Sequence, residues 1–415
     1  MIPFGRHGLP LQLPSHVESI VHRGSQPIAD ESAAVADALA HPIGTLPLRE
    51  IVKPGEKIAI VVNDITRLTR TDLFLPPVVA VLNAAGIPDC DIFIVFALGI
   101  HRPQTEAERV EIIGENLHRR IRNFDHDCWD DAGLVTLGRT SFGNTVQINR
   151  EVWEADRIIL TGEIIYHLIA GYSGGRKSLV PGVAGARTTT FNHGMIFDPA
   201  CRSGLLEGNP AHEDLLEACR MADPDFIINV VLDPEGRLLR VVAGHFDLAH
   251  REGCRAVDAA LSASVGEPYD LIIASAGGYP LDLDLRQAHK GLENACAALK
   301  HGGSILFYAE CPNGAGHRRF EDFVQQYDDE FAMQKALEER FEVGGHKAYW
   351  IARLGRLYDV CLVSTLDSPF VDRCHFRHVP VAEHQTWADR LCAGAKLIGF
   401  MPHSGHTLPI VRSSH

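Results

Sequence analysis

The chain has 415 residues, of which 46% are hydrophobic and 22% are charged, and its formal net charge is −14. This length suggests two domains, and the negative charge argues against a nucleic-acid partner. No run approaches the roughly 20 apolar residues that span a bilayer, so we expect no membrane partner either. Ten scattered cysteines without a C-x-x-C pair, and an N-terminus without the apolar core of a signal peptide, predict a cytoplasmic protein with reduced thiols.

The first part of the chain alternates buried-strand patterns with helical ones, which is typical of an α/β fold. Strands are predicted over 57–63, 91–97 and 156–161, with helices over 73–85 and from 104–108 onward. A strand pair is predicted over 226–232 and 238–243, joined by the Asp-Pro-Glu-Gly turn at 233–236, and a helix over 248–263.

The alternation restarts after Gly266, where Gly-Glu-Pro predicts a domain junction. Strands over 271–275, 304–309 and 360–364 follow, with helices near 287–299 and within 321–341. We therefore predict two α/β domains with mainly parallel sheets and an interdomain active-site cleft. The expected boundaries are 1–265 for the N-terminal domain, 266–395 for the C-terminal domain, and 396–415 for a tail that returns to the N-terminal domain.

Charged and basic side chains follow the first two predicted strands. Asp64 and Arg67 come directly after the strand at 57–63, and His101 lies on a turn after the strand at 91–97. Ligands of parallel sheets bind at the carboxyl ends of strands, where Asp64 and Arg67 could hold one ligand and His101 could transfer protons. Each residue alone is also compatible with a surface ion pair, a helix N-cap or a structural hydrogen bond.

The stretch from His167 to His193 is the most specific part of the chain. It contains Gly174, Gly175 and Lys177, with an arginine between the second glycine and the lysine. That arginine argues against a Walker-type phosphate loop, which needs glycine immediately before the lysine. Glycines let a ligand approach the backbone, and a lysine beside an arginine among apolar residues is a candidate for a lowered pKa and covalent attachment. We predict a cofactor site here, in preference to a glycine-rich connector with incidental polar residues.

A fourth group opens the second predicted domain, after the strand at 271–275. Gln287 and Lys290 lie one helical turn apart, and Arg286 and His289 form a second such pair. Cationic residues are unfavourable in the first turn of a helix, which mildly favours a function over a solvated surface.

These groups, in this order over nearly the whole chain, resemble the lactate racemase family of nickel-pincer-dependent 2-hydroxyacid racemases and epimerases. The resemblance implies that the nickel-pincer nucleotide, a pyridinium-3,5-bisthiocarboxylic acid mononucleotide that holds nickel, is covalently attached to Lys177. It further implies that His193 is the nickel ligand. We assign Asp64, Gly174 and Gly175 to the same cofactor site.

The resemblance also implies the catalytic set, with His101 and His167 as opposed acid/bases and with Arg67, Gln287 and Lys290 around the substrate. In that mechanism the C2 hydrogen of a 2-hydroxy acid moves as a hydride to the cofactor and returns to the opposite face. Arg67 and Lys290 would hold the carboxylate and polarise the developing carbonyl. The implied partners are the small-molecule 2-hydroxy acid and the cofactor-maturation enzymes.

One position departs from the family pattern. The resemblance implies a tyrosine immediately before Gln287, and Arg286 stands there instead. An arginine in the pocket would suit a second carboxylate or several hydroxyls better than a methyl group. We therefore hypothesise a substrate more polar than lactate, such as a hydroxydicarboxylate or a sugar acid.

Two other readings of the sequence are open. Lys177 could serve a Schiff-base or pyridoxal-phosphate enzyme, or the chain could be a non-catalytic two-domain ligand-binding protein. The presence of every matched residue argues against a decayed site. The substrate, the favoured direction, the oligomeric state and the orientation of Arg286 are open at this point.

Overall fold

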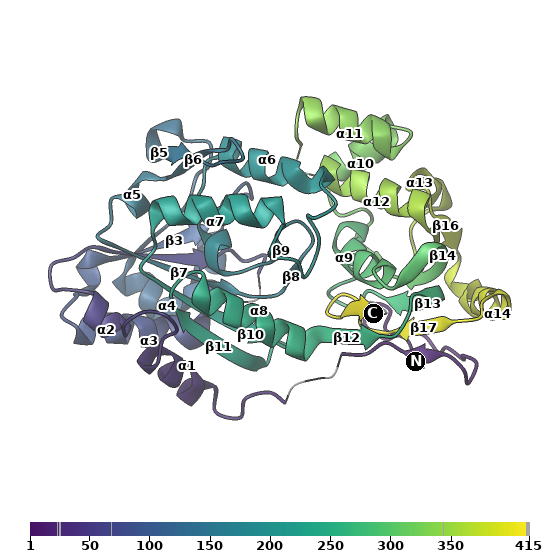
Figure 1. Ribbon diagram of the computed structural model, residues 1–415, viewed down its shortest axis with the longest axis horizontal. Coiled ribbons are helices and arrows are strands. Elements are labelled where there is room, and N and C mark those ends of the chain that lie inside the picture. Colours follow the sequence, from purple (N-terminus) through teal and green to yellow (C-terminus); the bar gives the residue numbers. More distant parts are fainter. Residues whose placement is uncertain (23, 25, 68, 343, 412–415) are drawn as a thin grey trace. The chain divides into compact units, whose positions relative to one another are not determined.

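The structure is a computed structural model that describes residues 1–22, 24, 26–67, 69–342 and 344–411. Residue contacts divide the chain into two compact units (Figure 1). The first unit is Ser25–Ala260, and the second unit is Met1–Gly24 together with Leu261–His415. Each unit contains a six-stranded, mainly parallel sheet, which confirms the predicted α/β class.

The sheet of the first unit has the order β11-β10-β7-β2-β3-β4. Only β10 and β11 pair in antiparallel fashion, as expected for two strands joined by a tight turn. The strands are β2 (Ile58–Asn63), β3 (Ile92–Ala97), β4 (Arg122–Asp125), β7 (Arg157–Glu163), β10 (Phe226–Leu232) and β11 (Leu238–Gly244).

Both faces of this sheet are covered, which explains why its strands are continuous apolar runs. Ile58, Ile60 and Val62 of β2 pack into one core, and Ala59 and Val61 pack into the other. The first core also contains residues of α1 (Glu31–Ala40), α3 (Thr71–Ala84) and α4 (Glu106–Arg120). The second contains residues of α7 (Pro210–Ala222) and α8 (Leu248–Leu261).

Shorter elements complete the first unit and carry most of the predicted site. The hairpins are β5 (Leu134–Arg139) with β6 (Thr145–Asn149), and β8 (Tyr166–His167) with β9 (Gly171–Tyr172). The helices are α2 (Leu48–Ile51), α5 (Arg150–Trp153), α6 (Ala186–Gly194) and the 3-10 turns η1 (Asp89–Asp91), η2 (Asp131–Gly133), η3 (Gly175–Ser178) and η4 (Met195–Phe197).

The second unit has a fully parallel sheet of order β1-β17-β13-β14-β15-β16. Its strands are β1 (Glu18–Ser19), β13 (Tyr269–Ser275), β14 (Leu299–Tyr308), β15 (Asp359–Val363), β16 (Arg377–Val379) and β17 (Ile398–Met401), and β12 (Ser262–Val265) pairs separately with β18 (Leu408–Val411). Its helices are α9 (Leu285–Cys296), α10 (Arg318–Gln326), α11 (Glu330–Glu339), α12 (Gly345–Leu357), α13 (Ser368–Arg373), η5 (Val381–Glu383) and α14 (His384–Gly394).

The ends of the chain differ from the prediction. The tail does not return to the N-terminal domain, because β17 is buried between β1 and β13 in the sheet of the second unit. The first 24 residues also belong to this unit, where Ile2 and Phe4 enter its core. The helix expected over 248–263 ends at Leu261 and gives way to β12, so the units divide slightly before 266.

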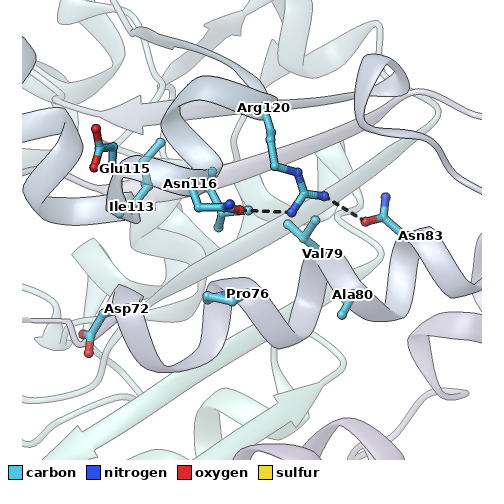
Figure 2. A pocket seen from close by; sticks show the side chains of 11 residues that line it. Asp72, Pro76, Val79, Ala80, Asn83, Ile113, Glu115, Asn116 and Arg120 are labelled. Atoms are coloured by element: carbon cyan, nitrogen blue, oxygen red, sulfur yellow. Dashed lines mark hydrogen bonds between the residues drawn. The ribbon is translucent and has the colours of Figure 1, made fainter.

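A surface pocket of about 320 Å³ lies between α3 and α4 (Figure 2). It adjoins Gly114, which breaks the helical geometry of α4 with a φ of 77°. Arg120 spans the gap by hydrogen bonds to Asn116 and Asn83. None of the residues predicted from the sequence to carry chemistry lines this pocket.

Among the residues that the structure describes, no helix is long and apolar enough to cross a membrane. All ten cysteines are described and are free thiols, and all except Cys90 are buried.

Candidate active site

Asp64 and His101 meet at the carboxyl edge of the first sheet. Asp64 directly follows β2 and His101 lies on the turn after β3, and these strands are parallel neighbours. The Nδ1–H of His101 donates to Asp64 Oδ2 at 2.6 Å. The Asp64 side chain is only 5% exposed, whereas that of His101 is 44% exposed. The carboxylate is therefore shielded, and the imidazole reaches solvent.

The surroundings of Asp64 keep it ionised. Burial alone would raise the pKa of Asp64, but hydrogen bonds from His101 and Thr66, with the charges of His101 and Arg67, lower it below its ordinary value. When the His101 ring is neutral, an ionised Asp64 fixes its proton on Nδ1 and leaves the lone pair on Nε2. His101 therefore presents a proton acceptor at Nε2.

The turn that carries His101 is bonded to the loop after Lys177. The Gly99 N–H donates to the Gly182 carbonyl at 2.9 Å, and the Gly182 N–H donates to the Lys177 carbonyl at 3.1 Å. Lys177 itself lies on η3, which packs against β2, β7 and β10. The structure thus places His101 and Lys177 on neighbouring loops of the same unit.

Lys177 has the electrostatic surroundings of an amine nucleophile. Burial, together with the charges of Arg176 and Arg67, lowers the pKa of Lys177 well below its ordinary value. The charge of Arg67 also helps to lower the pKa of Asp64. Arg67 is exposed, so its guanidinium is accessible to a ligand.

The Arg176 side chain forms buried hydrogen bonds that the sequence did not indicate. Its side chain is 1% exposed and donates to the carbonyls of Ala170 at 2.9 Å and Tyr172 at 3.2 Å. It also donates to His250 Nε2 at 2.8 Å. Arg176 therefore ties the turn that carries Lys177 to the β8–β9 hairpin.

Gly174 and Gly175 pack closely against other parts of the protein. Gly174 and Gly175 have φ values of 72° and 52°, which favour glycine. A Cβ at Gly174 would lie 2.6 Å from Ile164 Cγ1, and one at Gly175 would lie 2.9 Å from His250. The Gly175 N–H already donates to Asn229 Oδ1 at 2.8 Å. This amide is therefore bonded within the protein, and the assignment of Gly174 and Gly175 to the cofactor site stays a prediction.

His167 has the opposite arrangement to His101. It lies on β8, and its Nδ1 accepts the backbone N–H groups of Ile169 and Ala170, each at 3.2 Å. A ring nitrogen that accepts hydrogen bonds carries no proton, so the proton of the neutral ring is on Nε2. His167 therefore presents a donor at Nε2, whereas His101 presents an acceptor.

His193 has the geometry of a metal-binding histidine. It lies on α6, and its Nδ1–H donates to the Thr189 carbonyl one turn earlier, at 3.0 Å. This bond fixes the proton of the neutral ring on Nδ1, and a backbone carbonyl is a usual partner for the second nitrogen of a ligating histidine. The neighbouring Asn192 anchors the helix, since it donates to the buried Asp214 and to the Ala211 carbonyl, each at 2.9 Å.

The second unit contains the remaining predicted residues on α9. The Asp284 side chain caps this helix by accepting the Gln287 N–H at 2.8 Å. The Lys290 ammonium donates to Gln287 Oε1 at 3.2 Å, so these two residues share a face as the spacing predicted. Lys290 is exposed.

Arg286 lies in the first turn of the same helix, four residues before Lys290. Its side chain is partly buried, and its Nε is buried without a hydrogen-bond partner. Close by, His289 donates to the Arg286 carbonyl at 2.7 Å and accepts a hydrogen bond from Lys347 at 3.1 Å. The N-terminal part of α9 is therefore rich in cationic and donor groups.

Comparison with known proteins identifies relatives of the whole chain. The lactate racemase N-terminal domain model matches residues 4–204, and the lactate racemase C-terminal domain model matches residues 265–393. The lactate racemase of Thermoanaerobacterium thermosaccharolyticum is 34% identical over 343 residues, which are 81% of this chain and 80% of that protein. The lactate racemase of Lactiplantibacillus plantarum is 36% identical over 301 residues, which are 72% and 70% of the two chains.

Solved structures show the same architecture. The lactate racemase apoprotein from T. thermosaccharolyticum superposes with a TM-score of 0.90 at 30% identity, and the match covers 99% of each chain. A protein from Thermotoga maritima shares the fold at 16% identity, with a TM-score of 0.67 and coverage of 94% of this chain and 100% of that one.

Proposed function

This chain belongs to the lactate racemase family of isomerases, and from that premise we propose that it inverts the C2 centre of a 2-hydroxy acid with a nickel-pincer nucleotide bound to Lys177. The observation that carries the proposal is the position of Lys177 on the η3 turn, beside the buried Arg176 and on a loop bonded to the turn of His101. Burial and the charge of Arg176 lower the pKa of Lys177 there. A neutral amine is nucleophilic near neutral pH, whereas an ordinary lysine is almost fully protonated.

The donor groups of the first unit fit this cofactor. Lys177 offers an amine for covalent attachment, and His193 offers an Nε2 lone pair for nickel because its Nδ1–H is bonded to Thr189. When bound by Lys177 and His193, the nickel-pincer nucleotide would supply a reversible acceptor for the C2 hydride. Loading depends on separate cofactor-maturation enzymes.

The two catalytic histidines are matched as acceptor and donor. His101, oriented by Asp64, takes the hydroxyl proton of the bound substrate at Nε2. His167 donates to the C2 oxygen through Nε2–H, which its bonds to Ile169 and Ala170 favour. For the opposite enantiomer the two histidines exchange these roles.

Arg67 and Lys290 bind the substrate carboxylate in this proposal. Both side chains are exposed, and each offers charge-assisted hydrogen bonds. Gln287 supports this role because its Oε1 accepts a hydrogen bond from the Lys290 ammonium.

We propose further that the substrate is more polar than lactate. Arg286 lies one helical turn before Lys290, and its Nε has no protein partner. A second carboxylate or several hydroxyls on the substrate would satisfy it. Assays of the holoenzyme on lactate, malate and gluconate test this, and a clear preference for lactate would refute it.

The decisive test of the function combines intact-protein mass with metal analysis, on protein co-expressed with the maturation enzymes. We expect the wild type to carry an adduct and equimolar nickel, and Lys177→Ala to carry neither. Lys53→Ala, at an exposed lysine of the same unit, is the matched control and keeps both. Absence of both from the wild type would overturn the proposal, and a borohydride-sensitive chromophore without nickel would indicate a pyridoxal-phosphate enzyme instead.

A further inference from the structure

The hairpin that carries His167 is too short to hold its own shape. Its strands, β8 and β9, have two residues each, and isolated hairpins of this kind are at best marginally stable in water. The antiparallel register pairs Tyr166 with Tyr172 and His167 with Gly171. The position of His167 therefore depends on what anchors the hairpin to the rest of the unit.

One anchor is a carboxylate on α8. Asp258 Oδ1 accepts the hydroxyl of Tyr166 at 2.9 Å and the hydroxyl of Tyr172 at 2.7 Å. The two rings lie against each other with centroids 5.5 Å apart. Burial raises the pKa of both tyrosines, so both hydroxyls stay protonated and can donate. A single oxygen atom thus fixes both strands of the hairpin to α8.

The anchor reaches His167 through the backbone. Tyr166 immediately precedes His167, and neighbouring side chains of a strand point to opposite faces. The bonds of Tyr166 on one face therefore set where His167 projects on the other. Within the same turn, the Ala170 N–H holds the His167 ring and Arg176 holds the Ala170 carbonyl. Asp258 thus bonds the strands of the hairpin, whereas Arg176 also bonds the turn between them.

We propose that Asp258 is a positioning residue for His167 and acts through the hydroxyls of Tyr166 and Tyr172. This inference rests on the proposed function, which gives His167 its task at the C2 oxygen. Asp258 touches neither substrate nor cofactor in this role. Since both hydroxyls bond the same oxygen, an amide oxygen at this position can replace the carboxylate.

The kinetic test compares Asp258→Ala with Asp258→Asn in the loaded enzyme. Displacement of a catalytic group by about 1 Å can cost about 100-fold in rate, so we expect kcat of Asp258→Ala to fall by about that factor with KM within about twofold. Asp258→Asn is expected to keep kcat within about threefold. The solvent deuterium isotope effect on kcat is expected to rise in Asp258→Ala, because proton transfer becomes slower than the other steps.

The double variant Tyr166→Phe with Tyr172→Phe removes only the two hydroxyls and serves if Asp258→Ala does not fold. The double variant is expected to show the same fall in kcat and the same rise in the solvent isotope effect as Asp258→Ala. Tyr269→Phe is the matched control, because it removes one tyrosine–carboxylate bond, to Glu18 at 2.9 Å, from the second unit. The mass of the adduct on Lys177 is measured for every variant and is expected to be unchanged.

A measurement on the apoprotein separates this inference from the proposed function. Hydrogen exchange of the Ile169 and Ala170 amides, which bond His167, is expected to quicken in Asp258→Ala and in the double variant but not in Asp258→Asn. Unchanged exchange of these two amides in Asp258→Ala and in the double variant would overturn the inference. A wild-type kcat in the double variant would also overturn it, as would a loss of kcat in Asp258→Asn equal to that in Asp258→Ala. If the wild type carries no adduct and racemises no substrate, the proposed function is wrong. The hydrogen-exchange rates of the Ile169 and Ala170 amides still show in that case whether Asp258 positions the hairpin.

Discussion

Asp64→Asn is the sharpest test of how the protein prepares His101. The substitution keeps the size of the side chain and removes its charge. Asp64 accepts the Nδ1–H of His101 at 2.6 Å and the Thr66 hydroxyl at 2.7 Å. If the amide nitrogen turns toward His101, Nδ1 must become the acceptor and the proton moves to Nε2. His101 then loses the lone pair that the proposed mechanism needs.

The size of the effect follows from two limits. If the amide oxygen faces His101, a charge-assisted hydrogen bond becomes a neutral one, which costs about 1–1.5 kcal/mol, or about tenfold in rate. In a buried serine-protease triad, the wrong tautomer costs about 10⁴-fold in kcat. The His101 side chain is 44% exposed, so water weakens the constraint here. We therefore expect kcat to fall by about 10²–10³-fold.

The assay follows interconversion of the enantiomers by loaded enzyme, with the Lys177 adduct quantified by mass. Asp37→Asn is the matched control, because Asp37 accepts the Nδ1–H of His41 at 2.9 Å on the exposed face of α1. A kcat for Asp64→Asn within threefold of the wild type would refute the role of Asp64. Loss of the adduct together with kcat would instead place Asp64 in the cofactor site, as the sequence first suggested.

Three further predictions concern other parts of the site. Lys177→Met is expected to raise the melting temperature of the apoprotein near neutral pH. The reason is that the low folded-state pKa of Lys177 makes the folded state bind fewer protons than the unfolded state. The gain in melting temperature should shrink as the pH approaches about 10.4, and a gain independent of pH would contradict this. Asn192→Ala is expected to lower bound nickel about tenfold and leave the adduct intact, because Asn192 anchors the helix of His193; metal analysis with intact mass checks it. Arg286→Tyr is expected to shift the ratio of kcat/KM for malate over lactate toward lactate by about tenfold or more, and an unchanged ratio would remove Arg286 from the pocket.

Local patterns were sufficient to predict the main elements of the fold. β2, β3, β7 and β10 are parallel neighbours buried along most or all of their length, and their apolar runs are visible in the sequence. The contact between Gln287 and Lys290 could also be predicted, because helical spacing alone brings them together. The position of the tail could not be predicted, because a short apolar strand such as β17 could pair within the sheet of either unit.

The chemistry of the candidate site depends on partners far away in the sequence. Asp64 and His101 are 37 positions apart and meet only because β2 and β3 are neighbours. The bond from Tyr166 to Asp258 spans 92 positions, and nothing in the sequence near α8 indicates it. The glycines of the glycine-rich segment pack closely against Ile164 and His250, and the sequence did not indicate these contacts.

The pairing of β1 with β17 affects the order in which the two units can fold during translation. β1 is synthesised before the unit Ser25–Ala260, whereas its partner β17 is synthesised after it. The continuous unit Ser25–Ala260 can fold while synthesis proceeds, as domains generally do. β1 and the apolar Ile2 and Phe4 have no complete sheet or core to join until the strands after Ala260 have been made. A bulky group attached near β1 would therefore disturb the later of the two folding steps.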